Sequence, residues 1–208
     1  AAMTLTGNLD VTGIGINQTG TLSVGGTTKL DAGVATDIAL NDGLNTFTGA
    51  VSVVSADNVT LNNSVDLTLA DITATGKVDL TSAGSILDSN GALNDVTSDE
   101  LVLSAGTGID SLETQCNTIS ANTTTGNISI VNTNVSSTLV PYLQAGSGGI
   151  SFEQTGGGDL EIDQLTATGG DVTVINSGVD ASTDIDDLYM DNSLKATRGR
   201  LTIDANGD

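Results

Sequence analysis

The sequence has no histidine and no tryptophan, and it has one cysteine and one proline among its 208 residues. A single cysteine, Cys116, cannot form a disulfide within the chain. Without histidine a cysteine nucleophile would lack its usual base, so Cys116 is expected to be a small buried residue. Aromatic residues make up only 2% of the chain, so its core has to be built from Val, Ile, Leu, Ala and Thr. No apolar run approaches the about 18 residues of a membrane-spanning helix.

Basic residues are also scarce. Five Lys and Arg stand against 26 Asp and Glu, which gives a formal net charge of −21. Nucleic acid is excluded as a default partner because its phosphates are bound through cationic side chains, and anionic membrane surfaces are disfavoured for the same reason. We interpret the acidity as a solubility feature. Salt and divalent ions are expected to act on it by general screening and not at a defined site.

What the sequence does contain is a pattern that recurs over long distances. The octapeptide at 13–20 returns at 149–156, with a looser copy at 84–91, and the hexapeptide at 7–12 is answered at 76–81. The two offsets, from Gly7 to Gly76 and from Gly13 to Gly149, fit a repeat of about 68 residues, run about three times. We interpret residues 1–208 as a single β-solenoid unit. It is expected to be a fragment of a longer repetitive chain, because the pattern starts and ends midway.

Short strands are indicated by triplets in which a middle residue, usually polar, separates two apolar ones, with Gly, Asn, Asp, Ser and Thr supplying the turns between them. The triplets lie at residues 9–11, 22–24, 38–40, 51–53, 59–61, 67–69, 78–80, 101–103, 128–130, 160–162, 172–174 and 201–203. Their period of two places the outer residues of each triplet on one face. Ile14, Ile16, Val78 and Leu80 are therefore expected in the core.

These strands could form an antiparallel sandwich or a parallel solenoid. A sandwich favours strands of about five or six residues and aromatic anchors, whereas this chain has shorter strands, few aromatics and a long-range repeat. We predict an all-β, right-handed parallel β-helix with coils of about 20 residues. Leu112, Cys116 and Ile119 have helix-like spacing, but the Thr and Asn around them disfavour a helix, so this segment is expected to be a lateral part of a coil.

The best candidate for a calcium or glycosidase-type site is the Asp184–Asp187 segment, which precedes Lys195, Arg198 and Arg200. Since carboxylates are common in so acidic a chain, we interpret residues 180–191 as a solvated loop. Residues 105–112 resemble one calcium-binding nonapeptide without the tandem copies that its chemistry needs. The glycines at 156–158 lack the Lys and Ser or Thr of a phosphate loop. Both segments are expected to be turns, and no catalytic, cofactor-binding or metal-ligating residue and no cofactor is assigned.

Several strings of this sequence are similar to one another and to a known class of repeats. They lie at residues 7–12, 16–20, 22–24, 25–33, 37–42, 47–53, 109–114 and 121–128. Together they resemble the repetitive shaft of filamentous-haemagglutinin-type adhesins and other large bacterial surface proteins. The resemblance implies a right-handed parallel β-helix on a secreted, surface-held giant protein. The secretion domain of that family is marked by Asn-Pro motifs, and the only proline here follows Val140, so the chain is expected to be shaft.

The expected function is therefore that of a structural or adhesive shaft segment, not of an enzyme. It would support attachment to a host or partner-cell surface through the parent protein, from a secreted or cell-surface location associated with the outer membrane. Two alternatives stay open at this point. One is a β-helix enzyme or tailspike-like domain that acts on polysaccharide, and the other is a passive calcium-binding spacer.

Overall fold

A computed structural model describes the backbone of residues 2–177, 181–190, 194–196 and 200–203, and the side chains of this range up to residue 187. Within these residues every element of secondary structure is a β-strand, and every strand pairing is parallel. The structure confirms the predicted all-β solenoid. All twelve apolar triplets lie within strands.

The strands form two long stacks that run the length of the molecule. Stack 1 consists of β3 (Ile16–Asn17), β6 (Ile38–Leu40), β9 (Val59–Asn63), β11 (Lys77–Ser82), β13 (Val96–Ala105), the second half of β14 (Gly108–Thr123), β16 (Thr138–Ala145), β18 (Leu160–Ala167), β20 (Ser182–Met190) and β22 (Arg200–Ile203). Successive partners are between 18 residues apart, as for Leu101 and Ile119, and 23 residues apart, as for Val78 and Leu101. Each coil is thus close to the expected length.

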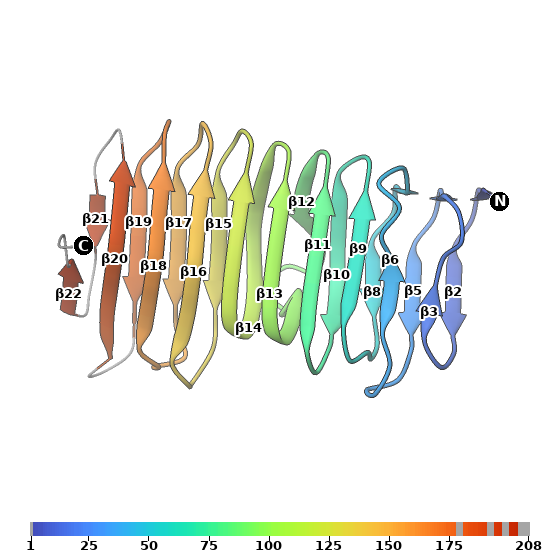
Figure 1. Cartoon of the computed structure of the whole chain (residues 1–208), viewed down its shortest axis with the longest axis horizontal. Helices are drawn as coiled ribbons and strands as arrows, with labels where there is room; N and C mark the ends of the chain where they lie inside the picture. The colour runs from blue at the N-terminus through green and yellow to red at the C-terminus, as the bar shows by residue number, and fades with distance from the viewer. Residues whose placement is uncertain (1, 178–180, 191–193, 197–199, 204–208) are drawn as a thin grey trace.

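Stack 2 lies behind stack 1 and closes each coil (Figure 1). It consists of β2 (Leu9–Thr12), β5 (Thr28–Asp31), β8 (Val51–Val53), β10 (Leu67–Thr73), β12 (Ser85–Asp88), the first half of β14, β15 (Ile128–Asn132), β17 (Ile150–Gln154), β19 (Val172–Asn176) and β21 (Leu194–Ala196). A third, short sheet near the N-terminus contains β1 (Met3–Leu5), β4 (Leu22–Val24) and β7 (Thr46–Phe47).

The coils wind in a right-handed sense. In Figure 1 the strands of stack 1 run upward nearer the viewer, those of stack 2 run downward behind them, and the chain advances from right to left. The chain therefore rises in front, passes backward at the top and descends behind while it moves left. Seen along this direction of advance it turns clockwise, which is the right-handed sense. The predicted handedness is confirmed. The first and last described strands consequently lie at opposite ends of a rod.

The core lies between the two stacks and follows from the triplet pattern. The outer residues of nearly every triplet in the described part are buried, as in Val78 and Leu80 of β11, which are both 0% exposed. Ile16 is also buried, at 9% exposed, so three of the four named core predictions are confirmed. Both phenylalanines, Phe47 and Phe152, are fully buried among the aliphatic side chains.

The prediction that Ile14 belongs to the core is wrong. Its side chain is 94% exposed, because Gly13–Gly15 forms the bend between β2 and β3 and Gly15 adopts a positive φ of 72°. The likeness of residues 13–20 to 149–156 is misleading at this position. Ile150 begins β17 in stack 2, whereas the bend at Ile14 leads into stack 1. Similar short strings therefore open strands of both stacks.

Residues 112–119 are part of a strand. They belong to β14, whose 16 residues pass from stack 2 into stack 1 without a break in strand assignment. Within its stack 2 half, a register shift against β15 lies between Ile109 and Leu112, where Ser111 has a φ of 42°, and the strand changes stacks further on, between Thr114 and Thr118. Leu112, Cys116 and Ile119 are all buried. As expected, the segment is not a helix, and the prediction that Cys116 is buried is confirmed.

Buried amide side chains form a ladder inside the rod. Asn132, Gln154 and Asn176 occupy the same position in β15, β17 and β19, where the strands of stack 2 end. All three are at most 2% exposed. Nδ2 of Asn132 donates to Oε1 of Gln154 at 2.9 Å, and Nε2 of Gln154 donates to the carbonyl of Asn134 at 2.8 Å. The ladder satisfies polar backbone groups that the bend would otherwise leave buried and unpaired.

Glycine is required at some bends because the neighbouring coil passes close to its Cα. At Gly106, between β13 and β14, a Cβ atom would lie 2.0 Å from the carbonyl oxygen of Ala83. The Gly106 N–H donates to the carbonyls of Ser82 and Gly84 at 3.0 and 2.9 Å. The coils are therefore held together at this bend by backbone contacts that leave no room for a side chain.

Candidate functional site

The sequence-predicted carboxylate segment, Asp184–Asp187, lies on β20 and not in a loop. The interpretation of this region as a solvated loop is therefore wrong for residues 182–190, where the backbone is a strand that pairs with β18. The carboxylates of Asp184, Asp186 and Asp187 are exposed, while Ile185 points into the core at 0% exposed. Residues 180, 191 and 198 and the side chains of Lys195 and Arg200 lie outside the described part.

One of these carboxylates belongs to an exposed acidic trio. Single oxygen atoms of Glu161, Asp163 and Asp186 all lie within 4.8 Å of one another on β18 and β20. All three residues are exposed to solvent. Residues 105–112 and 156–158, the other two segments that were considered as motifs in the sequence, contain bends at residues 106–107 and 156–157. The trio thus has the character of a solvated strand surface.

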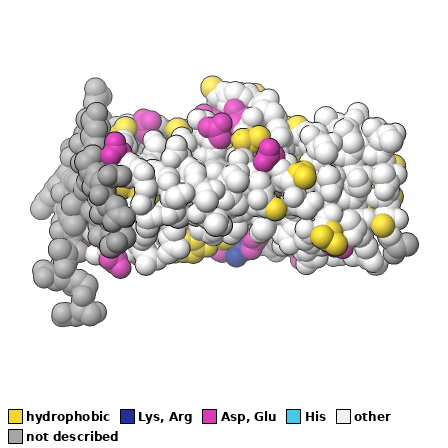
Figure 2. Space-filling model, turned by 90° about the horizontal axis from the view of Figure 1, so that it is seen from above, with side chains coloured by type: hydrophobic (Ala, Val, Ile, Leu, Met, Phe, Trp, Pro, Cys, Tyr) yellow, Lys and Arg dark blue, Asp and Glu magenta, His cyan; other side chains and the backbone are white. Residues whose placement is uncertain are grey.

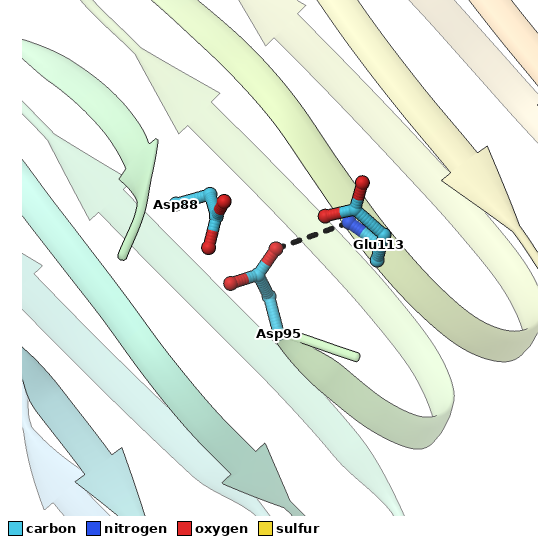
Figure 3. A group of neighbouring side chains, drawn as sticks. All are labelled: Asp88, Asp95 and Glu113. Atoms are coloured by element: carbon cyan, nitrogen blue, oxygen red, sulfur yellow. Dashed lines mark hydrogen bonds between the residues drawn. The ribbon is translucent and has the colours of Figure 1, made fainter. Parts of the chain in front are cut away.

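A second acidic group lies in the middle of the rod, and it was not found from the sequence. Asp88 ends β12, Asp95 directly precedes β13, and Glu113 is in the stack 2 half of β14. Between Asp88 and Asp95 the chain makes an outward loop of six residues, Ser89–Asn94. Single carboxylate oxygens of Asp88, Asp95 and Glu113 lie within 4.8 Å of one another. The three side chains face a common point in Figure 3.

Asp95 is the most enclosed member of this group. The residue is 0% exposed, and its backbone is fixed by hydrogen bonds to both neighbouring coils. The Ile72 N–H donates to the Asp95 carbonyl at 2.8 Å, and the Asp95 N–H donates to the Glu113 carbonyl at 2.7 Å. Its Oδ2 accepts the Glu113 N–H at 3.0 Å, which is the dashed line in Figure 3. Its Oδ1 has no hydrogen-bond partner.

The other two carboxylates are held more loosely. Asp88 closes the start of the outward loop, because its Oδ1 accepts the N–H groups of Asn90 at 2.5 Å and Gly91 at 3.1 Å. Both Asp88 and Glu113 are partly buried, and Oε2 of Glu113 is buried without a partner. Oδ1 of Asn90 in the same loop is also buried and unpartnered. Three buried oxygens without a hydrogen-bond partner therefore lie on Asn90, Asp95 and Glu113.

The charges of this group perturb one another. Burial raises the pKa of the Asp95 carboxyl to about 8; the Glu113 N–H that it accepts opposes this, and the Asp88 carboxylate adds to it. Burial also raises the pKa of Glu113, again with a contribution from Asp88. Like charges and a low-dielectric surrounding both disfavour the ionised form. Perturbed carboxyl groups of this kind are typical of functional sites.

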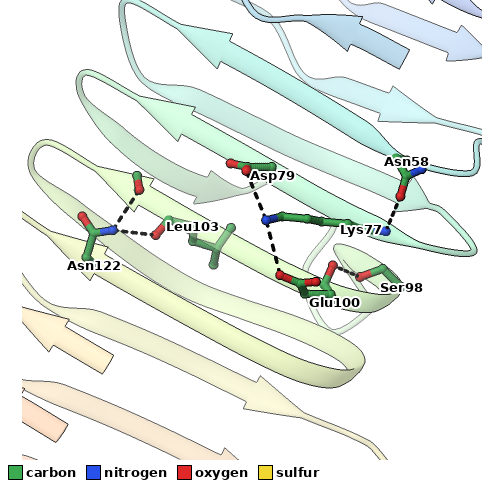
Figure 4. Close-up of polar contacts among 8 residues, drawn as sticks. Asn58, Lys77, Asp79, Ser98, Glu100, Leu103 and Asn122 are labelled. Carbon is green, nitrogen blue, oxygen red and sulfur yellow. Dashed lines mark hydrogen bonds and ion pairs between the residues drawn. The ribbon is translucent and has the colours of Figure 1, made fainter. Parts of the chain in front are cut away.

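Elsewhere on the surface, polar side chains link neighbouring coils. Lys77 of β11 lies between Asp79 of its own strand and Glu100 of β13, with Nζ at 3.5 Å and 3.3 Å from their carboxylates (Figure 4). Both ion pairs are solvent-exposed, so their effect on stability is small. Figure 2 shows acidic side chains gathered on a protruding part of one face and apolar side chains scattered over it.

The described residues contain no helix that is long and apolar enough to span a membrane. A family model described as repeats of unknown function (DUF5649) matches residues 1–54 and 56–125, more than half of the chain. No curated protein and no solved structure matches the chain. The two matched segments are separated by one residue, and each spans more than two coils.

Proposed function

We propose that this chain, which belongs to the family of repeats of unknown function (DUF5649), is a structural and adhesive shaft segment of a giant secreted or surface-anchored bacterial adhesin. One observation carries the proposal: two stacks of parallel strands continue along the described chain, with its two ends at opposite ends of the rod (Figure 1). A segment of this shape adds its whole length to the parent chain, since each coil advances by one strand spacing, about 4.8 Å.

The mechanism is mechanical. Nearly all bonds of a coil are with the coil before or after it, so the rod holds whatever lies beyond it at a fixed distance. The described strands supply this stiffness through backbone ladders and through the internal Asn132–Gln154 contact. The acidic surface, with five basic residues against 26 acidic ones, keeps neighbouring rods apart. The partner would be a host or partner-cell surface that is reached through the parent protein.

The decisive experiment is an in-frame deletion of residues 1–208 from the parent gene in its native bacterium. We expect the shortened parent protein to be exported and accessible to protease on intact cells, and attachment to fall because the distal part is held closer to the cell. Replacing the segment with an unrelated parallel β-solenoid of equal length should restore attachment if the segment only spaces. Recovery of the protein solely from inside the cell, or unchanged attachment, would refute the proposal.

The experiment also separates spacing from adhesion. If the unrelated solenoid restores export but not attachment, the segment itself binds, and purified chain should then compete with whole cells for the target surface. A polysaccharide-acting enzyme is tested by incubating the purified chain with acidic polysaccharides, for which we expect no cleavage. Turnover that is lost in Asp186→Asn would replace the shaft function with an enzymatic one.

A further inference from the structure

The carboxylates of Asp88, Asp95 and Glu113 have the arrangement of ligands around a hard cation. Calcium binds oxygen atoms at about 2.3–2.6 Å and accepts irregular geometry, so two of its ligand atoms lie at most about 5 Å apart. The three carboxylate oxygens here lie within 4.8 Å of one another. We propose that Asp88, Asp95 and Glu113 form a Ca²⁺ site that joins two neighbouring coils of the rod.

A separate observation points to a ligand at this place. Asp95 is fully buried and directed into the group, yet its Oδ1 has no hydrogen-bond donor. The buried Oε2 of Glu113 lacks one too. A buried carboxyl oxygen without a partner costs free energy, so such groups are normally hydrogen-bonded or coordinate a metal. By contrast, the trio of Glu161, Asp163 and Asp186 is exposed on all three side chains and shows no such deficit.

The nearby positive charge that could otherwise neutralise the group is missing from the described part. The two described basic side chains are Lys29 and Lys77, and Lys77 is paired with Asp79 and Glu100. Three carboxylates on an irregular loop and two coils suit Ca²⁺ better than Mg²⁺, which demands a near-ideal octahedron and keeps its waters. The site is therefore expected to prefer calcium.

The position of the site explains what the ion would do. Asp88 belongs to one coil and Glu113 to the next, because β12 pairs with β14, and Asp95 lies at the end of the outward loop between them. A bound ion would fasten this loop to the rod at the point where the regular coil is interrupted. This proposal departs from the expectation that ions act on the chain only by screening. It depends on the fold alone, so its failure would leave the shaft proposal unaffected.

The test is isothermal titration calorimetry of the chelator-treated chain with CaCl₂ in a buffer of constant ionic strength. We expect saturable binding of one ion per chain and a rise in melting temperature that NaCl at matched ionic strength does not reproduce. Asp95→Asn and Glu113→Gln should each weaken binding at least tenfold. Asp110→Asn, an exposed carboxylate on the same strand as Glu113, and Asp186→Asn in the exposed trio should bind as the unaltered chain does.

Circular dichroism of each variant controls for folding, and Glu113→Gln serves if Asp95→Asn does not fold, because Glu113 is only partly buried. If the chain shows no saturable binding heat up to millimolar calcium, protons alone neutralise these carboxyl groups, and the proposal is wrong. Binding that survives in Glu113→Gln but is lost in Asp186→Asn would place the ion at the exposed trio and would also overturn it. Equal binding of Mg²⁺ would contradict the preference for calcium.

Discussion

The side-chain amide of Asn132 hydrogen-bonds the backbone of Cys116 as a neighbouring strand would. The Cys116 N–H donates to Oδ1 of Asn132 at 3.0 Å, and Nδ2 of Asn132 donates to the Cys116 carbonyl at 3.0 Å. This spot lies between the end of the β14–β15 ladder at Thr114 and the start of the β14–β16 ladder at Thr118. Asn63 binds the N–H and carbonyl of Phe47 in the same way, at 2.8 and 3.1 Å.

Replacing Asn132 with alanine should therefore destabilise the rod strongly. The change leaves the buried N–H and carbonyl of Cys116 unpaired, which costs about 2–6 kcal/mol for the two groups. Urea denaturation followed by circular dichroism measures the loss. Asn62→Ala is the matched control, since the Asn62 side chain is only partly buried and makes one bond, to the Asn41 carbonyl. Equal urea midpoints of unfolding for the two variants would show that the hydrogen bonds of Asn132 do not contribute to stability.

A side chain at Gly106 should not fit. In Gly106→Ala the new Cβ would lie 2.0 Å from the Ala83 carbonyl oxygen, so the two coils must separate locally at a cost of about 1–3 kcal/mol. Gly43→Ala is the control, because no atom lies within 4 Å of a Cβ placed there. Differential scanning calorimetry should show a lower melting temperature for Gly106→Ala alone. The same melting temperature for both variants would mean that the coils do not approach as closely at this bend.

Two residues that were both expected in the core, of which one lies in a bend, should respond differently to truncation. Leu80→Ala removes a fully buried side chain and should cost about 2–5 kcal/mol. Ile14→Ala removes an equally apolar side chain that is 94% exposed, and the free energy of unfolding should change by less than about 0.5 kcal/mol. Urea titrations of the two variants provide the comparison. A large loss for Ile14→Ala would place that residue in the core after all.

The thiol of Cys116 should be inert in the folded chain. Burial raises its pKa to about 11, with a partial opposing effect of the hydrogen bond from Ser98. Since the unperturbed value is 9.0, the thiolate fraction at pH 8 falls about a hundredfold, and the side chain is only 1% exposed. Labelling with a thiol reagent, read by mass spectrometry, should be negligible in buffer and complete in urea. Rapid native labelling would contradict the burial of Cys116.

The strands were predictable because their signal is local, whereas the acidic group was not. Each triplet carries its own alternation, and Val78 and Leu80 needed no knowledge of any other coil. Ile14 was misplaced because a similar string, that of Ile150, opens a strand of the opposite stack. Asp95 meets Glu113 only through the register of neighbouring coils, and Asp88 joins them across an outward loop.

The unequal length of the coils has an evolutionary consequence. The strands keep their pairing although successive partners are 18 to 24 residues apart, so most of the extra residues are absorbed in the bends and the outward loop. Insertions and deletions there can remodel the flank of the rod while leaving its interior untouched. Residues 133–137, between β15 and β16, include the exposed Val135. A foreign peptide grafted at Val135 would be displayed sideways from the rod.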